Sequence, residues 1–245
     1  MTQEEFKQDV SIIDTSTYQR QYDVKKHEIF TNKHKFPDPE IVIPLTDEVG
    51  NPLLDSQNKP RFEKRTRSLN RIGLPYQKRI VEIATMFQTA IPYKYTAEDS
   101  PLFAAFQEVI KANKMSFSDS AICTEVKRYT LVAELWYLEE HPNEQYGVPT
   151  QYLLRHKVLS PLKYKLYPRF DDNDNLISFA IESTTKDNKK TIFQGFTADE
   201  IYTFTTENGV TTTEVKPNII GKIPVVLYRQ EETEWNAVQH LIEIA

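Results

Sequence analysis

Residues 177–215 read ISFAIESTTKDNKKTIFQGFTADEIYTFTTENGVTTTEV, and this stretch decides the fold class. Apolar and polar residues alternate in it with a period of two, as in Ile177, Phe179 and Ile181. Such alternation is typical of a β-strand with one buried face. Asn208-Gly209 between two such runs favours a tight hairpin turn. The stretch therefore predicts consecutive antiparallel strands.

The same period continues on both sides of this stretch, and helical periods precede and follow it. Strand patterns occupy residues 152–158, 162–167, 191–196, 201–206, 210–215 and 223–228, with one further run at 132–138. Helical spacing indicates helices at 74–89, 101–113 and 118–130, and an outgoing helix from Trp235. In the first helix the predicted core stripe is Ile72, Ile80, Ile83, Ala84 and Phe87. The predicted class is α+β, with about three helices, an antiparallel meander of about six strands and an outgoing C-terminal helix.

The first 68 residues differ from the rest of the chain. They combine charges with five prolines and show no sustained apolar period. We interpret residues 1–68 as an extended polar and basic arm that docks on something else, because it lacks the residues for its own core. Residues 69–245 form the predicted α+β domain. The spacing of the last helix runs to the final residue without a capping glycine, so we expect the natural protein to continue past Ala245.

Composition excludes few functions. The formal charge of the 245 residues is −5, which opposes a chain that coats itself in nucleic acid. The longest apolar run, 223–228, is too short to span a bilayer, so no membrane role is expected. The single cysteine, Cys123, lies among apolar residues on a predicted helix and is interpreted as a core residue. The five histidines are scattered, and His156 is interpreted as a satisfied sheet residue. Since no nucleophile, base and oxyanion donor come together, we predict no catalytic residues, no cofactor and no enzyme activity.

One stretch resembles a calcium loop. Asp171, Asn173, Asn175, the Ile177 carbonyl and Glu182 occupy ligand positions 1, 3, 5, 7 and 12 of that template. Position 6 should be glycine but is leucine, and the residues that follow alternate like a strand instead of a helix. A polar hairpin turn is therefore the favoured interpretation, and the metal site is the weaker one.

A dense basic run lies between residues 59 and 79. It is a candidate for nucleic-acid or subunit contact through Arg61, Lys64, Arg65, Arg67 and Arg71. No aromatic residues are interleaved at stacking spacing, so pairing with acidic surfaces of neighbouring subunits, or simple solvation, stays open.

The order of these segments resembles the portal proteins of tailed bacteriophages, in the branch found in siphovirus-like particles. Four stretches between residues 69 and 245 carry the resemblance. Residues 76–95 (YQKRIVEIATMFQTAIPYKY) resemble the family's helix and following short segment, though the usual glycine is missing. Residues 103–137 resemble its paired helices and strand, with Asn113, Asp119 and Leu135-Trp136-Tyr137 matching. Residues 159–181 resemble its hairpin with Asp171-Asp172.

The most specific match is residues 219–243, IIGKIPVVLYRQEETEWNAVQHLIE, which is similar to the family pattern GxxPVVxY…E…LI. The resemblance implies the wing region of a portal, without the stem, clip and crown that follow it. Trp235 and Leu241 are the candidate subunit-interface residues; packing within their own chain is the favoured alternative for this pair.

The resemblance also implies a function. We expect a structural virion protein, a homo-oligomeric and by resemblance dodecameric ring at the portal vertex, assembled in the host bacterial cytoplasm. Double-stranded DNA would be packaged and ejected through it, and the major capsid protein, terminase and head-completion or adaptor proteins would be its partners. Two alternatives stay open. One is a nucleic-acid-processing enzyme or accessory domain using Asp171, Asp172 and Asp174; the other is a different head–tail connector protein.

Overall fold

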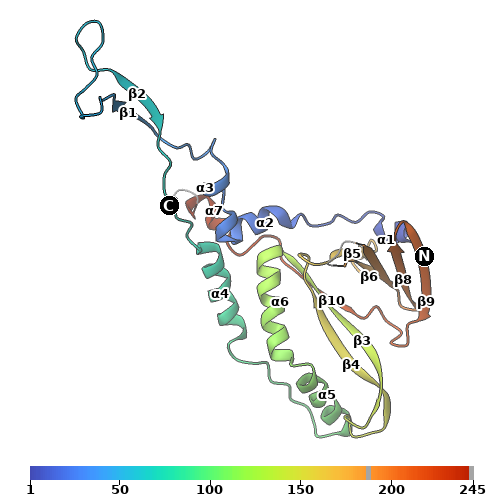
Figure 1. The fold of residues 1–245 in the computed structure, drawn as a ribbon. Coiled ribbons are helices and arrows are strands. Elements are labelled where there is room, and N and C mark those ends of the chain that lie inside the picture. Colours follow the sequence, from blue (N-terminus) through green and yellow to red (C-terminus); the bar gives the residue numbers. More distant parts are fainter. Residues whose placement is uncertain (186–188, 243–245) are drawn as a thin grey trace. The chain divides into compact units, whose positions relative to one another are not determined.

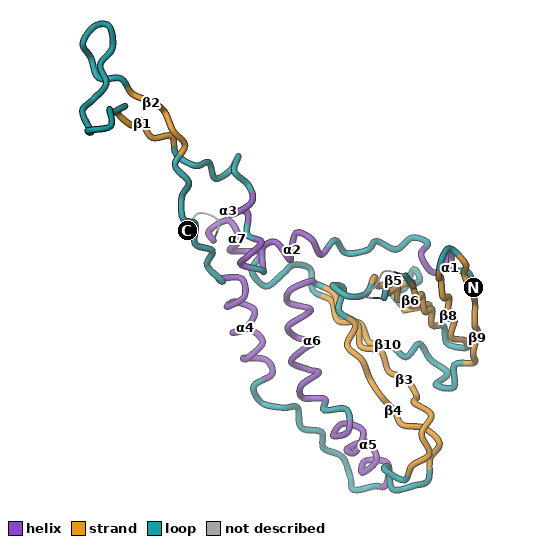
Figure 2. Tube along the Cα trace, in the orientation of Figure 1, coloured by secondary structure: helices purple, strands orange, loops and turns teal. Residues whose placement is uncertain are grey.

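A computed structural model describes residues 1–185 and 189–242 (Figure 1). The α+β class is confirmed, with helices and antiparallel strands following one another along the chain (Figure 2). Contacts divide the chain into two compact units. Unit 1 comprises Met1–Tyr18 and Gln77–Ala245, and unit 2 comprises Gln19–Tyr76. Glu243 and Ala245, the ends of the quoted motif and of the chain, lie outside the described residues.

The largest sheet of unit 1 is a five-stranded antiparallel meander. Its strands run in sequence order, so each is hydrogen-bonded to the next. Phenylalanines pair across it, with Phe179 opposite Phe196 and Phe193 opposite Phe204. The strands are β5 (Lys165–Phe170), β6 (Leu176–Thr184), β7 (Lys190–Phe196), β8 (Glu200–Glu207) and β9 (Val210–Pro217). The period-two pattern of residues 177–215 thus predicts this sheet correctly.

Helix α1 (Gln3–Lys7) covers one face of the meander through Phe6. The Phe6 side chain is fully buried and lies 5.6 Å, ring centre to ring centre, from Tyr202 in an edge-on arrangement. The Phe6 ring lies over the backbone of Gly195 on β7, where an added Cβ would be 2.4 Å from the ring. The sheet therefore has a glycine where the phenylalanine ring approaches the backbone.

The second sheet of unit 1 has three antiparallel strands in the order β10-β3-β4: β10 (Val225–Arg229), β3 (Leu131–Asn143) and β4 (Thr150–Leu159). Alternate residues of β3 face opposite sides. Leu131, Ala133 and Leu135 join the core formed with the meander, and β3 also contacts helix α6 (Met115–Tyr129). The first five residues of β3 are consequently all buried.

Two further helices of unit 1 precede α6. Helix α4 spans Tyr76–Thr89 and helix α5 spans Pro101–Ala112. Ser100 caps α5 by accepting a hydrogen bond from the Phe103 amide at 3.1 Å, and Pro101 is its first residue, as predicted. Of the predicted outgoing helix, the described residues form a 3₁₀ turn, η2 (Asn236–Val238), and α7 (Gln239–Ile242).

Unit 2 consists of short helices followed by a two-stranded hairpin. Helix α2 (Thr15–Tyr22) leads into it, and η1 (Val24–Lys26) and α3 (Glu28–Thr31) follow. Strands β1 (Glu40–Pro44) and β2 (Phe62–Thr66) pair antiparallel. Two Asp turns lie between them, in which Asp47 accepts hydrogen bonds from the Val49 and Asn51 amides and Asp55 from the Gln57 and Lys59 amides. We call residues 40–67 the hairpin arm.

The described residues contain more strands than predicted, in three sheets instead of one meander. The division at residue 68 remains an expectation about domain organisation. In the structure, α1 of the predicted arm packs in unit 1, because Phe6 fills a place in its core. Among the described residues, no helix has the length and apolar character needed to cross a membrane.

Candidate interaction surface

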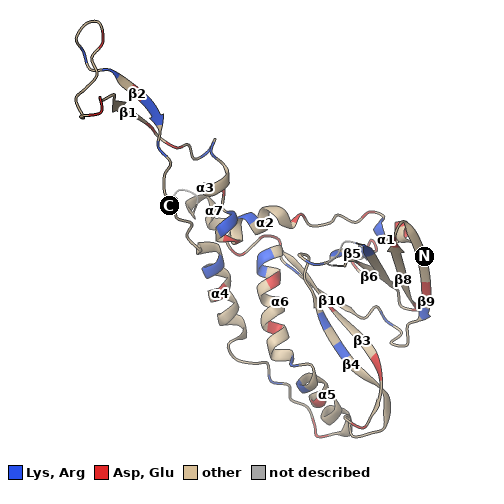
Figure 3. Ribbon diagram, viewed as in Figure 1, with Lys and Arg blue, Asp and Glu red and all other residues tan. Residues whose placement is uncertain are grey.

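Four of the five basic candidates lie in the hairpin arm and are exposed to solvent. Figure 3 shows the Lys and Arg residues of this region along β2. Arg65 pairs with Glu63 at 2.9 Å and Lys64 with Glu40 at 3.5 Å. Arg61 and Arg67 form no ion pair with any described residue, and both side chains are exposed. The arm therefore offers a basic, solvent-accessible face.

The fifth basic candidate, Arg71, has a structural place inside unit 2. Its guanidinium lies 2.7 Å from the Asp38 carboxylate and donates to the Phe36 carbonyl at 2.8 Å. Asp38 also accepts from the Leu69 amide, and this bond, followed by the Arg71 guanidinium, holds the pKa of Asp38 below its usual value. Arg71 is thereby engaged within its own chain, and its contact with nucleic acid or another subunit stays a prediction.

The two predicted interface residues near the C-terminus have different environments. Trp235 is fully buried, so its side chain fills the core of its own unit, as the favoured alternative held. Its neighbours tie this segment to α6: the Glu234 amide donates to the Lys127 carbonyl, and their side chains pair at 3.2 Å. Leu241 on α7 is exposed and stays a candidate for subunit contact.

The calcium-loop residues do not converge. Asp171 accepts hydrogen bonds from the Asn173 and Asn175 amides and from the Asn175 side chain, which closes a hairpin turn between β5 and β6. The Asn175 bonds, first that of its side chain and then that of its amide, hold the pKa of Asp171 below its usual value. Glu182 lies seven residues farther along, on β6, roughly 23 Å of extended strand from Asn175. It pairs there with Lys165 at 2.6 Å and Lys7 at 3.3 Å. No group of three potential ligand side chains occurs among the described residues.

A buried polar network connects the helices of unit 1 to its three-stranded sheet. Glu134 of β3 lies at its centre, with its carboxylate 3.3 Å from Nδ1 of His156 on β4. The Tyr228 hydroxyl of β10 donates to the other Glu134 oxygen at 2.9 Å. The side chains of Glu134 and His156 are about 95% buried, with exposed fractions of 4% and 5%. Charges this deeply buried are stable only when paired, so the three strands are linked by polar contacts as well as by their ladders.

The other His156 nitrogen faces the helical layer. Its Nε2 lies 3.2 Å from the Asn113 carbonyl and 2.9 Å from the Ser118 hydroxyl. A carbonyl only accepts, so Nε2 carries a proton, and the raised pKa of His156 favours the imidazolium form beside the Glu134 carboxylate. The Glu134 carboxylate, followed by the Asn113 carbonyl, raises the pKa of His156 against the opposing effect of burial. The Asn113 side-chain amide also donates to the Leu154 carbonyl at 2.9 Å, which ties the end of α5 to β4.

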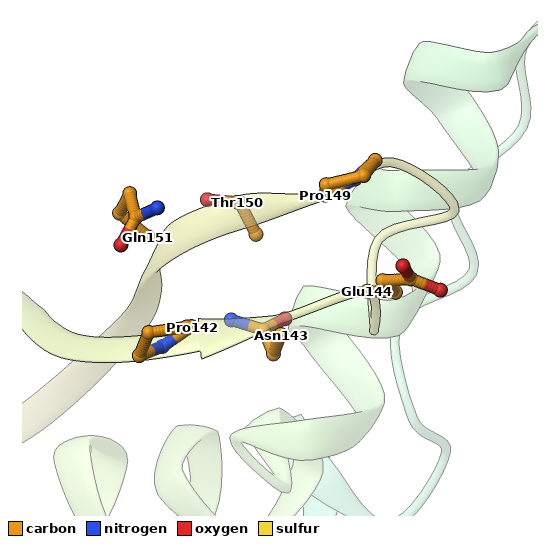
Figure 4. Close-up of a pocket in the computed structure, with 6 residues that line it drawn as sticks. All are labelled: Pro142, Asn143, Glu144, Pro149, Thr150 and Gln151. Carbon is orange, nitrogen blue, oxygen red and sulfur yellow. The ribbon is translucent and has the colours of Figure 1, made fainter.

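Ser118, His156 and Glu134 are in contact in the order of a hydrolase triad, but their environment is that of a structural network. A catalytic imidazole needs an Nε2 free to accept the serine proton, whereas this Nε2 is also directed at a carbonyl. The pocket shown in Figure 4, of about 360 Å³, is elsewhere, where β3 ends and β4 begins. Its lining residues are Pro142, Asn143, Glu144, Pro149, Thr150 and Gln151, which offer one carboxylate and no nucleophile–base pair.

Sequence reasoning misplaced the buried face of α4. The buried residues are Gln77, Val81 and Thr85, and the predicted core residues Ile83 and Phe87 are exposed. Both polar side chains have partners within unit 1, since the Gln77 side-chain nitrogen donates to Gln239 at 3.1 Å and Thr85 contacts Thr124 at 3.5 Å, whereas the Gln77 side-chain oxygen is buried without a hydrogen-bond partner among the described residues. Apolar periodicity normally marks the core-facing side of a helix, but here Ile83 and Phe87 are turned to solvent, while Ile80 and Ala84 are half-buried and Val81 is fully buried.

Comparison with known proteins places these surfaces in context. No curated protein matches the chain. The family model described as "Phage portal protein, SPP1 Gp6-like" matches residues 6–245, which covers both units and every candidate contact residue. A match of this extent shows the family to which the fold, the basic hairpin arm and the buried network belong. The chain is a member of the SPP1 Gp6-like family of phage portal proteins, structural components of the virion.

Proposed function

We propose that this chain builds a homo-oligomeric ring at the portal vertex, through which double-stranded DNA is packaged into the capsid and later ejected. The ring has twelve subunits, as the resemblance implies, and is assembled in the cytoplasm of the host bacterium. Terminase, the major capsid protein and head-completion proteins dock on it. In this arrangement the chain is a passage and an assembly platform, and terminase hydrolyses ATP.

The observation that carries the proposal is the family match over residues 6–245. Two features of the molecule support it. The hairpin arm has exposed basic and apolar residues suited to contact with other macromolecules. The buried contact of Glu134 and His156, with the bonds of His156 to Asn113 and Ser118, joins strands and helices of unit 1.

The test is the assembly state of the open reading frame that contains these residues. Negative-stain microscopy and mass photometry of its purified product should show rings with a central channel. A stable monomer or dimer would contradict the ring and favour the enzyme alternative. For that alternative, a magnesium-dependent nuclease assay on the protein and on Asp172→Ala is decisive, since activity lost in the variant would establish it.

A further inference from the structure

Helix α4 has its apolar side turned to solvent. Met86 is 66% and Phe87 88% exposed, and Ile83 and Ile91 are also exposed. The opposite side, with Gln77 and Thr85, is the buried one. A helix normally buries its apolar stripe, so this arrangement leaves an exposed stripe that needs a partner.

The segment between α4 and α5 is exposed and ends in two acidic residues. Glu98 and Asp99 lie just before α5, are exposed and form no ion pair with the described residues. Leu102, in the first turn of α5, is exposed as well. We call the exposed apolar set Ile83, Met86, Phe87 and Ile91 the α4 surface.

The hairpin arm has the complementary character. Phe62 is 59% exposed, and it lies on the same face of the hairpin as Val42, because Phe62 pairs with Pro44 two residues along the strand. Exposed Arg61 and Arg67 lie to either side of β2 in the sequence. A two-stranded hairpin with so little of its own core is stabilised by binding to another surface.

The charges of the two units are also complementary. Residues 19–76 contain 11 Lys and Arg against 8 Asp and Glu, a formal charge of +3. The whole chain has 30 against 35, so the remainder contains 19 against 27 and has a formal charge of −8. A basic element on an acidic molecule is attracted to the acidic part of a second copy.

We propose that the hairpin arm of one copy docks on the α4 surface of a second copy. Phe62 and Val42 cover Phe87 and Met86, while Arg61 and Arg67, which alternate with Phe62 along the chain, belong to the other face of the hairpin and add to its net positive charge. The contact is heterologous, since two different surfaces meet, and a heterologous contact closes into a ring when its rotation allows. The inference rests on the proposed ring and names the surfaces that join its subunits.

The experiment uses two variants of the chain that each lose one surface. Phe87→Asp breaks the α4 surface and keeps the arm, and Phe62→Asp breaks the arm and keeps the α4 surface. Both sites are exposed, so circular dichroism should show unchanged folding. Val210→Asp, on the exposed strand β9, is the matched control. Sedimentation velocity at up to about 100 µM measures each protein alone and the two variants mixed.

We expect the wild type and the control to self-associate and each surface variant alone to be monomeric. The 1:1 mixture should form a complex that stops at two chains, because it contains one intact arm–surface pair. Phe87→Ala, a truncation of a central aromatic, should weaken association of the wild type about 30-fold. A mixture that stays monomeric would overturn the proposal. If the wild type were monomeric while the mixture formed a two-chain complex, the arm of the wild type would bind the α4 surface of its own chain. That result would overturn the proposal that a second copy covers this surface.

Two further measurements distinguish this proposal from DNA binding by the arm and from the proposed ring itself. If Arg61→Glu with Arg67→Glu abolished binding to a 30-base-pair duplex and left the self-association intact, the basic side of the arm would belong to DNA. If the complete open reading frame with Phe62→Asp and Phe87→Asp still formed rings, the named surfaces would be wrong and the ring would stand. Absence of rings from the wild-type reading frame would instead refute the proposed function, whatever the mixing experiment shows.

Discussion

The buried pair of Glu134 and His156 should make the stability of unit 1 depend on pH, and Glu134→Gln should remove that dependence. The imidazolium is held by the carboxylate at 3.3 Å and by the Asn113 carbonyl at 3.2 Å. The pKa of His156 is therefore raised above its ordinary value of 6.5. A raised histidine pKa contributes stability that is complete below the unfolded value and is lost as the pH rises through the folded value.

The size of the effect follows from the contacts that change. Removing one partner of a buried pair outright costs about 3–5 kcal/mol. Glutamine keeps the shape of Glu134 and can still accept from the Tyr228 hydroxyl, so only the charged half of the interaction is lost. We expect Glu134→Gln to lower the free energy of unfolding by about 2 kcal/mol at pH 5.5. The loss should shrink as the pH rises through the folded pKa of His156, because the imidazole then becomes neutral.

Urea unfolding, followed by tryptophan fluorescence at several pH values, measures this difference. Trp136 is a suitable probe because its ring lies 5.2 Å from the His156 ring. Glu139→Gln is the matched control, since Glu139 lies on the same strand and pairs with Arg155 at the surface. Exposed pairs contribute roughly 0–1 kcal/mol, so the control should change little at any pH. An unchanged pH dependence in Glu134→Gln, or an equal loss in the control, would refute the reasoning.

Three further predictions concern the rest of unit 1. Phe6→Ala should cost about 3–5 kcal/mol in urea unfolding, because a fully buried ring would leave a cavity on the meander; a loss below about 1 kcal/mol would show that α1 is dispensable. Asp119→Asn should raise the urea midpoint at pH 7 and not at pH 3, since burial, followed by the Glu134 charge, raises the pKa of Asp119; a lower midpoint at pH 7 would contradict this. Burial opposes the ionisation of Glu182, but Lys165 and Lys7 outweigh it and lower its pKa below 4.5, so its contribution is present above that value and lost as the pH falls through the folded value. Glu182→Gln should accordingly flatten the acid side of the stability profile measured by circular dichroism, and an unchanged profile would count against the pair.

Local chemistry explains which elements were predictable. The meander follows from a period of two over nearly forty residues, and the turn before Val210 follows from Asn208-Gly209. Helix α5 begins where Ser100 and Pro101 predict it. Signals of this kind act between residues close in the sequence, so a single chain is enough to read them.

The buried network around Glu134 could not be predicted from patterns of residues that are close together in the sequence. Glu134 and Tyr228 are 94 residues apart and meet only because β10 pairs with β3. In the sequence Glu134 resembles any charged residue on the exposed face of a strand. Nothing near it indicates that β3 is covered by the meander on one side and by α6 on the other. The same limit hid the place of Phe6, a lone aromatic in a polar N-terminal segment that finds its partners on β7 and β8.

The residues of the candidate surface divide in the same way. Arg61, Lys64, Arg65 and Arg67 were recognisable from charge density alone, and the structure keeps them exposed. Arg71 belongs to the same run, but its partner Asp38 is 33 residues away and comes close only when unit 2 folds. The orientation of α4 required knowing that Gln77 has a bonding partner on α7.

The docking of α1 on the meander has a topological consequence. Because Met1–Tyr18 and Gln77–Ala245 belong to one unit, the chain leaves that unit once and returns to it, and Gln19–Tyr76 is an insertion tethered at both ends. A single proteolytic cut in the hairpin arm would therefore release neither piece, since the Phe6 ring would hold the N-terminal fragment in place without a covalent bond. Limited proteolysis followed by gel filtration would show the two fragments eluting together.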